Sequence, residues 1–225
     1  MLKWLSLSVV DTSINLNDAC TKRRGPTGQW FLESSKFANW SVLPQSFLWL
    51  HGKVGSGKTV LSSTIIQAVI EKHRASGGTR KVAYFYFDYG DQRKQKHQMM
   101  LRSLVAQLYA QSPGIPDVLD LVFNKCLHGL HQPSIDQLFQ LMRGLVDKSD
   151  DTFILIDALD EFEELDELLE DIETMTRWNL DNLHILVTSR DDYQIRQSIL
   201  PIAGDAIVSL GNSVVDSDIS IYISE

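Results

Sequence analysis

The sequence predicts an α/β fold: a doubly wound, mainly parallel sheet of five strands with helices on both faces. From residue 47 onward, short runs rich in β-branched and aromatic residues alternate with segments of helical periodicity, which is the pattern of βαβ units. The run Thr152–Asp157 is continuously apolar up to its final acid, as expected for a strand buried on both faces. A glycine-rich loop at residues 52–59 joins the first of these strands to the helix that follows it.

The expected elements can be placed along the chain by their patterns. Strands are expected at residues 47–50, 81–88, 152–157, 183–188 and 206–210, and helices at residues 59–74 and 99–109. Two further helices are expected before the third strand. The second of them begins with a capping box, Ser134 followed three residues later by Gln137, and it buries Leu138, Leu141, Met142 and Leu145.

The segment after the third strand is strongly acidic. Its apolar residues nevertheless keep helical spacing, namely Phe162, Leu165, Leu168, Leu169 and Ile172. We therefore expect most of its acids to form the solvated face of a helix, among them Glu163, Glu164, Asp166 and Glu167.

The chain divides into three parts. Residues 1–45 are expected to be a lead-in linker and helix, with a polar linker at residues 18–26 that ends in a turn. Residues 46–212 form the predicted core, and residues 213–225 begin a truncated helical segment whose apolar side has no partner. Four aromatic residues of the lead-in suit either core packing at the sheet edge or a pocket for a nucleotide base: Trp30, Phe31, Phe37 and Trp40.

Composition restricts the function classes. A net charge of -8 argues against a protein that binds duplex nucleic acid, which needs a basic face to displace counterions. Two cysteines are too few for a disulfide framework and suit a reducing compartment. We find no apolar run long enough to span a membrane and no signal-peptide cleavage site, so a cytoplasmic location is expected.

The loop at residues 52–59 has every part of a phosphate-binding loop. Its glycines let backbone N–H groups converge on phosphate oxygens, the lysine can reach the β and γ phosphates, and the threonine hydroxyl can bind Mg²⁺. The helix that starts there points its positive end at the same anion. The predicted nucleotide-binding residues are Gly52, Gly55, Ser56, Gly57, Lys58 and Thr59.

Acids follow the third strand and an arginine follows the fourth. Asp157 closes a buried strand, which is unfavourable unless it meets a cation or hydrogen-bond donors, so we expect it to hold Mg²⁺. Asp160 and Glu161 are candidates for orienting the attacking water. Arg190, in the run Thr-Ser-Arg, is either a contact to the γ-phosphate or a surface arginine ahead of a helix cap, and its position favours the former.

Two other polar clusters are given structural interpretations. Cys126, His128 and His131 are expected to form a loop rather than a zinc site, because a fourth ligand is lacking. The basic cluster of Arg93, Lys94, Lys96 and His97 is expected to be the solvated entrance of a helix.

Taken together, these motifs resemble the NACHT domain of STAND-class P-loop NTPases, which include NLR-like signalling proteins common in filamentous fungi. The resemblance rests on residues 52–59, on Asp157 with the small Ala158 and then the acidic pair, and on Thr188 to Arg190. Related remodelling ATPases usually place a catalytic Glu directly after the strand Asp, whereas NACHT domains have a small residue there. The lead-in motif at residues 28–34 is also similar, so the resemblance covers nearly the whole chain.

The resemblance implies roles for these residues. Lys58 and Thr59 would bind phosphate and Mg²⁺, Asp157 the metal, Asp160 and Glu161 would activate water, and Arg190 would sense the γ-phosphate. The lid, sensor and effector modules of such proteins have no counterpart before Glu225. We therefore expect modest nucleotide affinity and a mobile or self-associating C-terminus.

The expected function is a nucleotide-dependent switch. It would bind Mg²⁺ with ATP, or with GTP, hydrolyse it slowly, and use the γ-phosphate to select between conformations. The resemblance implies a role in innate-immunity-like or self/non-self recognition and cell-death signalling, with homo-oligomerisation of the full-length protein and no nucleic acid or membrane partner. The alternatives are a conventional P-loop ATPase or phosphotransferase, and a scaffold that binds nucleotide without turnover.

Overall fold

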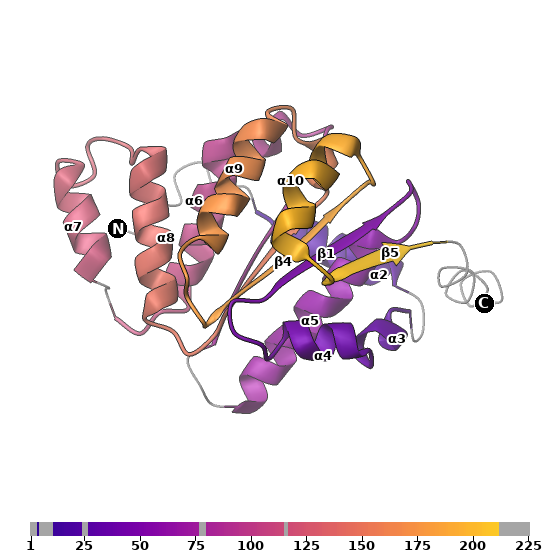
Figure 1. The fold of residues 1–225 in the computed structure, drawn as a ribbon. Coiled ribbons are helices and arrows are strands. Elements are labelled where there is room, and N and C mark those ends of the chain that lie inside the picture. Colours follow the sequence, from indigo (N-terminus) through magenta and orange to yellow (C-terminus); the bar gives the residue numbers. More distant parts are fainter. Residues whose placement is uncertain (1–3, 5–10, 24–26, 77–79, 115–116, 212–225) are drawn as a thin grey trace.

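A parallel sheet of five strands lies at the centre of the computed structural model, which describes residues 4, 11–23, 27–76, 80–114 and 117–211 (Figure 1). The strand order is β2-β3-β4-β1-β5, and every neighbouring pair is parallel. The strands are β1 (Phe47–Gly52), β2 (Lys81–Tyr86), β3 (Thr152–Asp157), β4 (Leu183–Ser189) and β5 (Ile207–Leu210). The predicted doubly wound, parallel α/β fold is confirmed.

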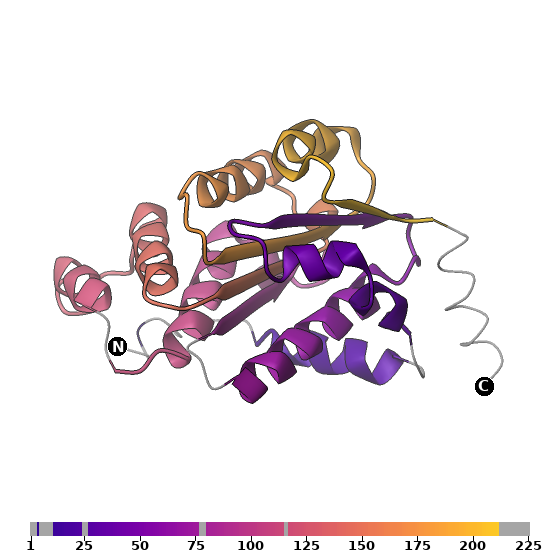
Figure 2. The same cartoon turned by 60° about the horizontal axis from the view of Figure 1, so that its bottom comes forward.

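Helices cover both faces of this sheet (Figure 2). Every residue of β1, β3 and β4 is buried, because alternate side chains enter the two apolar layers on either side. One layer is formed by α2 (Ser13–Lys22), α3 (Gln29–Leu32), α4 (Ser35–Trp40) and α5 (Lys58–Ser76). The other contains α6 (His97–Ala110), α8 (Ile135–Asp147), α9 (Leu165–Thr176) and α10 (Tyr193–Ala203), with α7 (Asp117–Lys125) packed on α8.

Within the described residues, no helix is long and apolar enough to cross a bilayer.

The lead-in is more regular than the sequence predicts. The linker expected at residues 18–26 is wrong in its first part, because α2 continues to Lys22 and packs against α5, with Ala19 buried and Leu16 partly buried against the core. Residues 24–26 lie outside the described part of the chain. Phe31, Phe37 and Trp40 are buried beneath the sheet, and the Trp40 indole N–H donates to the Ile185 carbonyl at 2.9 Å. The core-packing interpretation is therefore confirmed for these three aromatic residues.

Several element boundaries differ from those predicted. β2 ends at Tyr86 rather than at residue 88, because the chain turns at Asp88, whose carboxylate accepts the Gly90 N–H at 2.9 Å. β4 continues to Ser189, and α5 begins one residue early at Lys58. The capping box of α8 and the burial of its four predicted apolar residues are confirmed. Residues 213–225, expected to begin another helical segment, lie outside the described residues.

The solvated helix entrance predicted for the basic cluster at the start of α6 is confirmed for the exposed Arg93 and Lys96 and is wrong for the other two residues. Lys94 and His97 are both buried. The His97 ring contacts the Asp171 carboxylate of α9 through Nε2, and its Nδ1 lies 3.4 Å from Glu167 Oε2. Asp171 is likewise buried, so the acids of α9 do not all face solvent. This pair joins the start of α6 to α9 behind the sheet.

The His97 contact makes stability depend on pH. Burial alone would lower the pKa of His97, but the carboxylates of Asp171, Glu167 and Glu164 outweigh it and hold that pKa above its ordinary value. A raised pKa stabilises the fold below the unfolded pKa of about 6.5, and this contribution is lost as pH rises through the folded pKa. We expect His97→Gln to destabilise the protein more at about pH 6 than at about pH 9 in urea unfolding. The exposed His128, replaced by Gln, is the control; an equal loss for His97→Gln at both pH values would contradict this assignment.

Candidate functional site

The glycine-rich loop lies at the carboxyl edge of the sheet, between β1 and the N-terminus of α5. Gly55 and Gly57 have φ values of 76° and 80°, a conformation that side chains other than glycine rarely adopt. At Gly52 the constraint is contact, because an added Cβ would lie 2.6 Å from Ser56 Oγ and 3.0 Å from the Leu210 carbonyl. Each predicted glycine is therefore required by backbone geometry or by close packing.

Lys58 folds back over this loop. Its Nζ donates to the carbonyl oxygens of Gly52 and Lys53, both at 2.9 Å. Burial lowers the pKa of Lys58, and the opposing effect of the nearby Asp160 and Asp157 carboxylates does not cancel it. The ammonium group is thus held by neutral acceptors, which phosphate oxygens could replace with stronger, charged ones. The loop fits a phosphate group in a second respect: the buried Ser56 Oγ has no hydrogen-bond partner among the described residues.

Asp157 ends β3 with both carboxylate oxygens engaged. The Thr59 hydroxyl donates to Oδ2 at 2.8 Å, and the Thr188 hydroxyl donates to Oδ1 at 2.7 Å. Asp157 is only 3% exposed, and this burial raises its pKa in spite of the two hydrogen bonds. A cation would relieve this cost, and the Thr59 hydroxyl and a carboxylate are oxygen ligands of the kind that Mg²⁺ prefers. No group of three His, Cys, Asp or Glu in the described residues could hold a metal, so a cation here would need further ligands from phosphate or water.

Thr188 is a site residue to which sequence reasoning assigned no role. Besides donating to Asp157, its Oγ1 accepts the Ala158 backbone N–H at 3.0 Å. Ala158 has a φ of 62°, in the left-handed region, which turns the chain sharply after the strand. The signal available in the sequence was a residue with a hydroxyl group near the end of the strand that pairs with the strand ending in Asp157. It became decisive only once β3 and β4 were known to be neighbours.

The next two acids have different partners. Asp160 accepts the Arg190 backbone N–H at 2.8 Å through Oδ1, and its Oδ2 lies 2.9 Å from Arg190 Nε. Glu161 instead turns toward the segment after β2, where its Oε2 accepts the Tyr89 N–H at 3.2 Å. The arginine side chain is half exposed, whereas Asp160 is almost covered. The structure thus brings Asp160 and Arg190 together and places Glu161 beside them with another neighbour.

These groups surround one cavity of about 290 Å³. It is lined by residues 54–60, Ala158, Asp160, Glu161 and Arg190. Asp157 lies behind this lining and reaches it through Thr59. Another cavity, of about 360 Å³, lies at the amino ends of β1 and β5 and contains none of the predicted site residues.

Comparison with known proteins gives one family. The model of the family described as nephrocystin 3, N-terminal, matches residues 26–190, a range that includes the glycine-rich loop, the acids and Arg190. No curated protein matches the chain.

Solved structures share the fold at low identity. Cdc6p from Pyrobaculum aerophilum has a TM-score of 0.56 and 14% identity, covering 96% of this chain and 54% of that one. The Orc1 protein of Aeropyrum pernix, in complex with DNA, has a TM-score of 0.45 and 14% identity, covering 78% and 44%. The DUF1998 helicase MrfA, bound to DNA, has a TM-score of 0.40 and 14% identity, covering 90% and 29%. This chain therefore spans about half the length of Cdc6p and less than half the length of each of the other two proteins. At this identity, the likeness to Cdc6p establishes the fold alone.

Removing the Thr188 hydroxyl should destabilise the fold. Thr188→Val keeps the shape of the side chain but leaves Asp157 Oδ1 and the Ala158 N–H unpaired in the interior. Each unpaired buried group costs about 1–3 kcal/mol, so urea unfolding should show a loss of roughly 2 kcal/mol or more. Thr188→Ser retains the hydroxyl and is the matched control. Equal unfolding midpoints for the Val and Ser variants would show that these hydrogen bonds contribute nothing to stability.

Proposed function

Because the chain belongs to the nephrocystin 3, N-terminal family and is a NACHT-type P-loop NTPase domain, we propose that it is the nucleotide-dependent switch of a signalling protein. The observation that carries the proposal is the convergence of Lys58, Glu161 and Arg190 on one cavity at the carboxyl edge of the sheet. Ligands of open α/β sheets bind at this edge. The proposed module is the core at residues 46–212, preceded by the lead-in of residues 1–45.

The phosphates would be bound by the loop. Backbone N–H groups of Gly55, Ser56, Gly57 and the first turn of α5 would donate to the phosphate oxygens, with Gly52 allowing the close turn. Lys58 would exchange its two carbonyl acceptors for the β and γ phosphates. Thr59 and Asp157 would hold Mg²⁺, whose charge offsets that of the phosphate oxygens when it is bound.

The two acids after Asp157 would have different roles in hydrolysis. Glu161 lines the cavity and is the proposed group that orients or deprotonates the attacking water. Asp160 was predicted to do the same, but both of its oxygens are engaged by Arg190. We therefore assign Asp160 to aiming the Arg190 guanidinium at the γ-phosphate, where its planar donors can bind two oxygens.

Switching would follow from the position of Arg190. It lies between β4 and α10, so a contact made to the γ-phosphate and lost on hydrolysis would act directly on that junction. In the full-length protein we propose slow turnover of ATP or GTP, oligomerisation of the triphosphate form, and signalling in immunity-like or self/non-self recognition leading to cell death. The net charge of -8 favours a protein partner over DNA.

Lys58 should be needed for nucleotide binding. A hydrogen bond to a charged group contributes about 1.5–3 kcal/mol, so Lys58→Ala should lower triphosphate affinity at least about tenfold in calorimetric titration. Lys53→Ala is the control, since it removes the same charge from the same loop but outside the cavity lining. If Lys58→Ala bound triphosphate as tightly as Lys53→Ala, the loop would not be the nucleotide site.

The acids should separate binding from hydrolysis. Asp157→Asn should weaken binding that depends on Mg²⁺, because it removes the charge that faces the metal. Glu161→Gln should leave binding intact and slow single-turnover hydrolysis by about 100-fold, since water activation matters only on the way to the transition state. Equal loss of binding in both variants would contradict the division of roles and indicate a damaged fold.

A further inference from the structure

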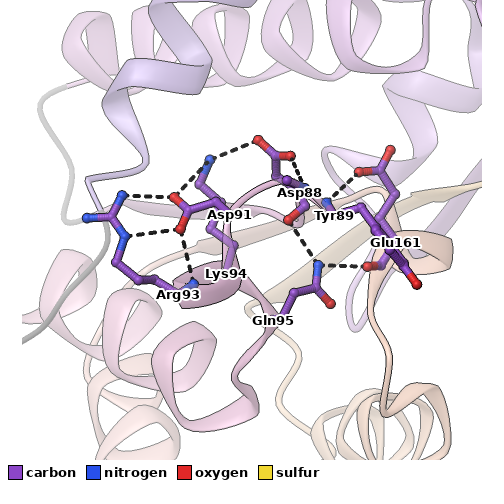
Figure 3. Close-up of polar contacts among 8 residues, drawn as sticks. Asp88, Tyr89, Asp91, Arg93, Lys94, Gln95 and Glu161 are labelled. Carbon is purple, nitrogen blue, oxygen red and sulfur yellow. Dashed lines mark hydrogen bonds and ion pairs between the residues drawn. The ribbon is translucent and has the colours of Figure 1, made fainter.

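Glu161 is bound to the segment that follows β2, residues 88–95 (Figure 3). The half-buried Gln95, at the end of the 3-10 turn Gln92–Gln95, makes three hydrogen bonds with its amide group. Its Nε2 donates to the Asp88 carbonyl at 3.0 Å and to the Glu161 carbonyl at 2.8 Å. Its Oε1 accepts the Glu163 N–H at 3.2 Å. One side chain thus ties two loops together with all of its hydrogen-bonding groups facing backbone.

The contact to Asp88 also affects the Glu161 side chain. The Asp88 carbonyl and the Tyr89 N–H belong to the same planar peptide unit, in which the two groups point in opposite directions. Gln95 Nε2 and the Asp91 N–H, at 3.1 Å, both donate to the carbonyl of this unit, and the N–H on its other side donates to Glu161 Oε2. Fixing the carbonyl therefore fixes the direction of the N–H. Gln95 is thus linked to the Glu161 carboxylate through this peptide as well as through its hydrogen bond to the Glu161 carbonyl.

The surrounding contacts hold segment 88–95 in place. The buried Lys94 lies 3.4 Å from Asp88 Oδ2 and 3.9 Å from Asp91 Oδ2, so it fixes the turn from within (Figure 3). The rings of Phe87, which precedes Asp88, and Phe162, which follows Glu161, pack with centroids 4.8 Å apart. Tyr89 itself is 69% exposed, so its N–H is held by these polar contacts and not by burial of its side chain.

We infer that Gln95 is a positioning residue for nucleotide hydrolysis, which aims the Glu161 carboxylate through the Asp88–Tyr89 peptide. This inference rests on the proposed role of Glu161. A glutamate side chain has several rotamers, and the reaction needs one of them at the attacking water. Gln95 is not among the residues that line the cavity, so it should affect the rate of hydrolysis and not the affinity for nucleotide.

Three variants and one double variant test this inference. Gln95→Ala should lower the single-turnover rate at saturating Mg²⁺ and ATP by about 10- to 100-fold, with the dissociation constant changed by less than about twofold. Gln98→Ala is the matched control, because Gln98 is also half buried and donates to the Pro133 carbonyl away from Glu161. In a Glu161→Gln background the Gln95→Ala change should have almost no further effect on the rate, because the two residues act in series.

A second readout needs no nucleotide. Gln95→Ala should speed amide hydrogen exchange at Tyr89 by about tenfold or more, whereas Gln98→Ala should not change it. Unchanged exchange at Tyr89, or the same rate loss from Gln95→Ala in both backgrounds, would overturn the inference and leave Gln95 with a structural role. If Glu161→Gln slowed hydrolysis but Gln95→Ala did not, the inference alone would fail. If Glu161→Gln hydrolysed ATP at the parent rate, the proposed role of Glu161 would be wrong and the positioning role would fall with it.

Discussion

The buried carboxylate of Asp157 is the constraint on which the site depends. Desolvation of a charge is costly, and this cost is partly offset by hydroxyl groups from two other elements, Thr59 at the start of α5 and Thr188 in β4. These hydrogen bonds fix the glycine-rich loop and the end of β4 relative to β3. The position of the cavity follows from these contacts, because α5 and β4 both bind the carboxylate at the end of β3.

The two acids that follow Asp157 along the chain, Asp160 and Glu161, bind different neighbours. Asp160 turns to the chain after β4 and binds Arg190, while Glu161 turns to the chain after β2 and binds the Tyr89 peptide. The order β2-β3-β4 in the sheet makes this possible, since the loop after β3 has a neighbour on each side. Residues adjacent in sequence therefore belong to different hydrogen-bond systems, and the site draws on loops after four strands of the sheet: β1, β2, β3 and β4.

What could be predicted from the sequence was local. Strand patterns, the glycine-rich loop and the capping box at Ser134 each depend on a few neighbouring residues, and they were placed to within a few positions. α2 was missed because its inward side has one buried residue, Ala19, and one partly buried apolar residue, Leu16, which together give little hydrophobic periodicity. The pairs His97 with Asp171 and Gln95 with Glu161 could not be predicted, because they depend on the sheet order and on where loops meet. The functional roles assigned to Lys58, Asp157, Glu161 and Arg190 stay predictions.

The central claim is that nucleoside triphosphate binds with Mg²⁺ at the carboxyl edge of the sheet. Mapping amide chemical shifts while a slowly hydrolysed ATP analogue is titrated with Mg²⁺ tests it most directly. The account predicts that the largest changes fall on residues 52–59, on residues 157–161 and on Arg190, and that those at 157–161 weaken when Mg²⁺ is withheld. Changes centred instead on the cavity beside Trp40 and Ala203, or no changes at saturating analogue, would contradict it.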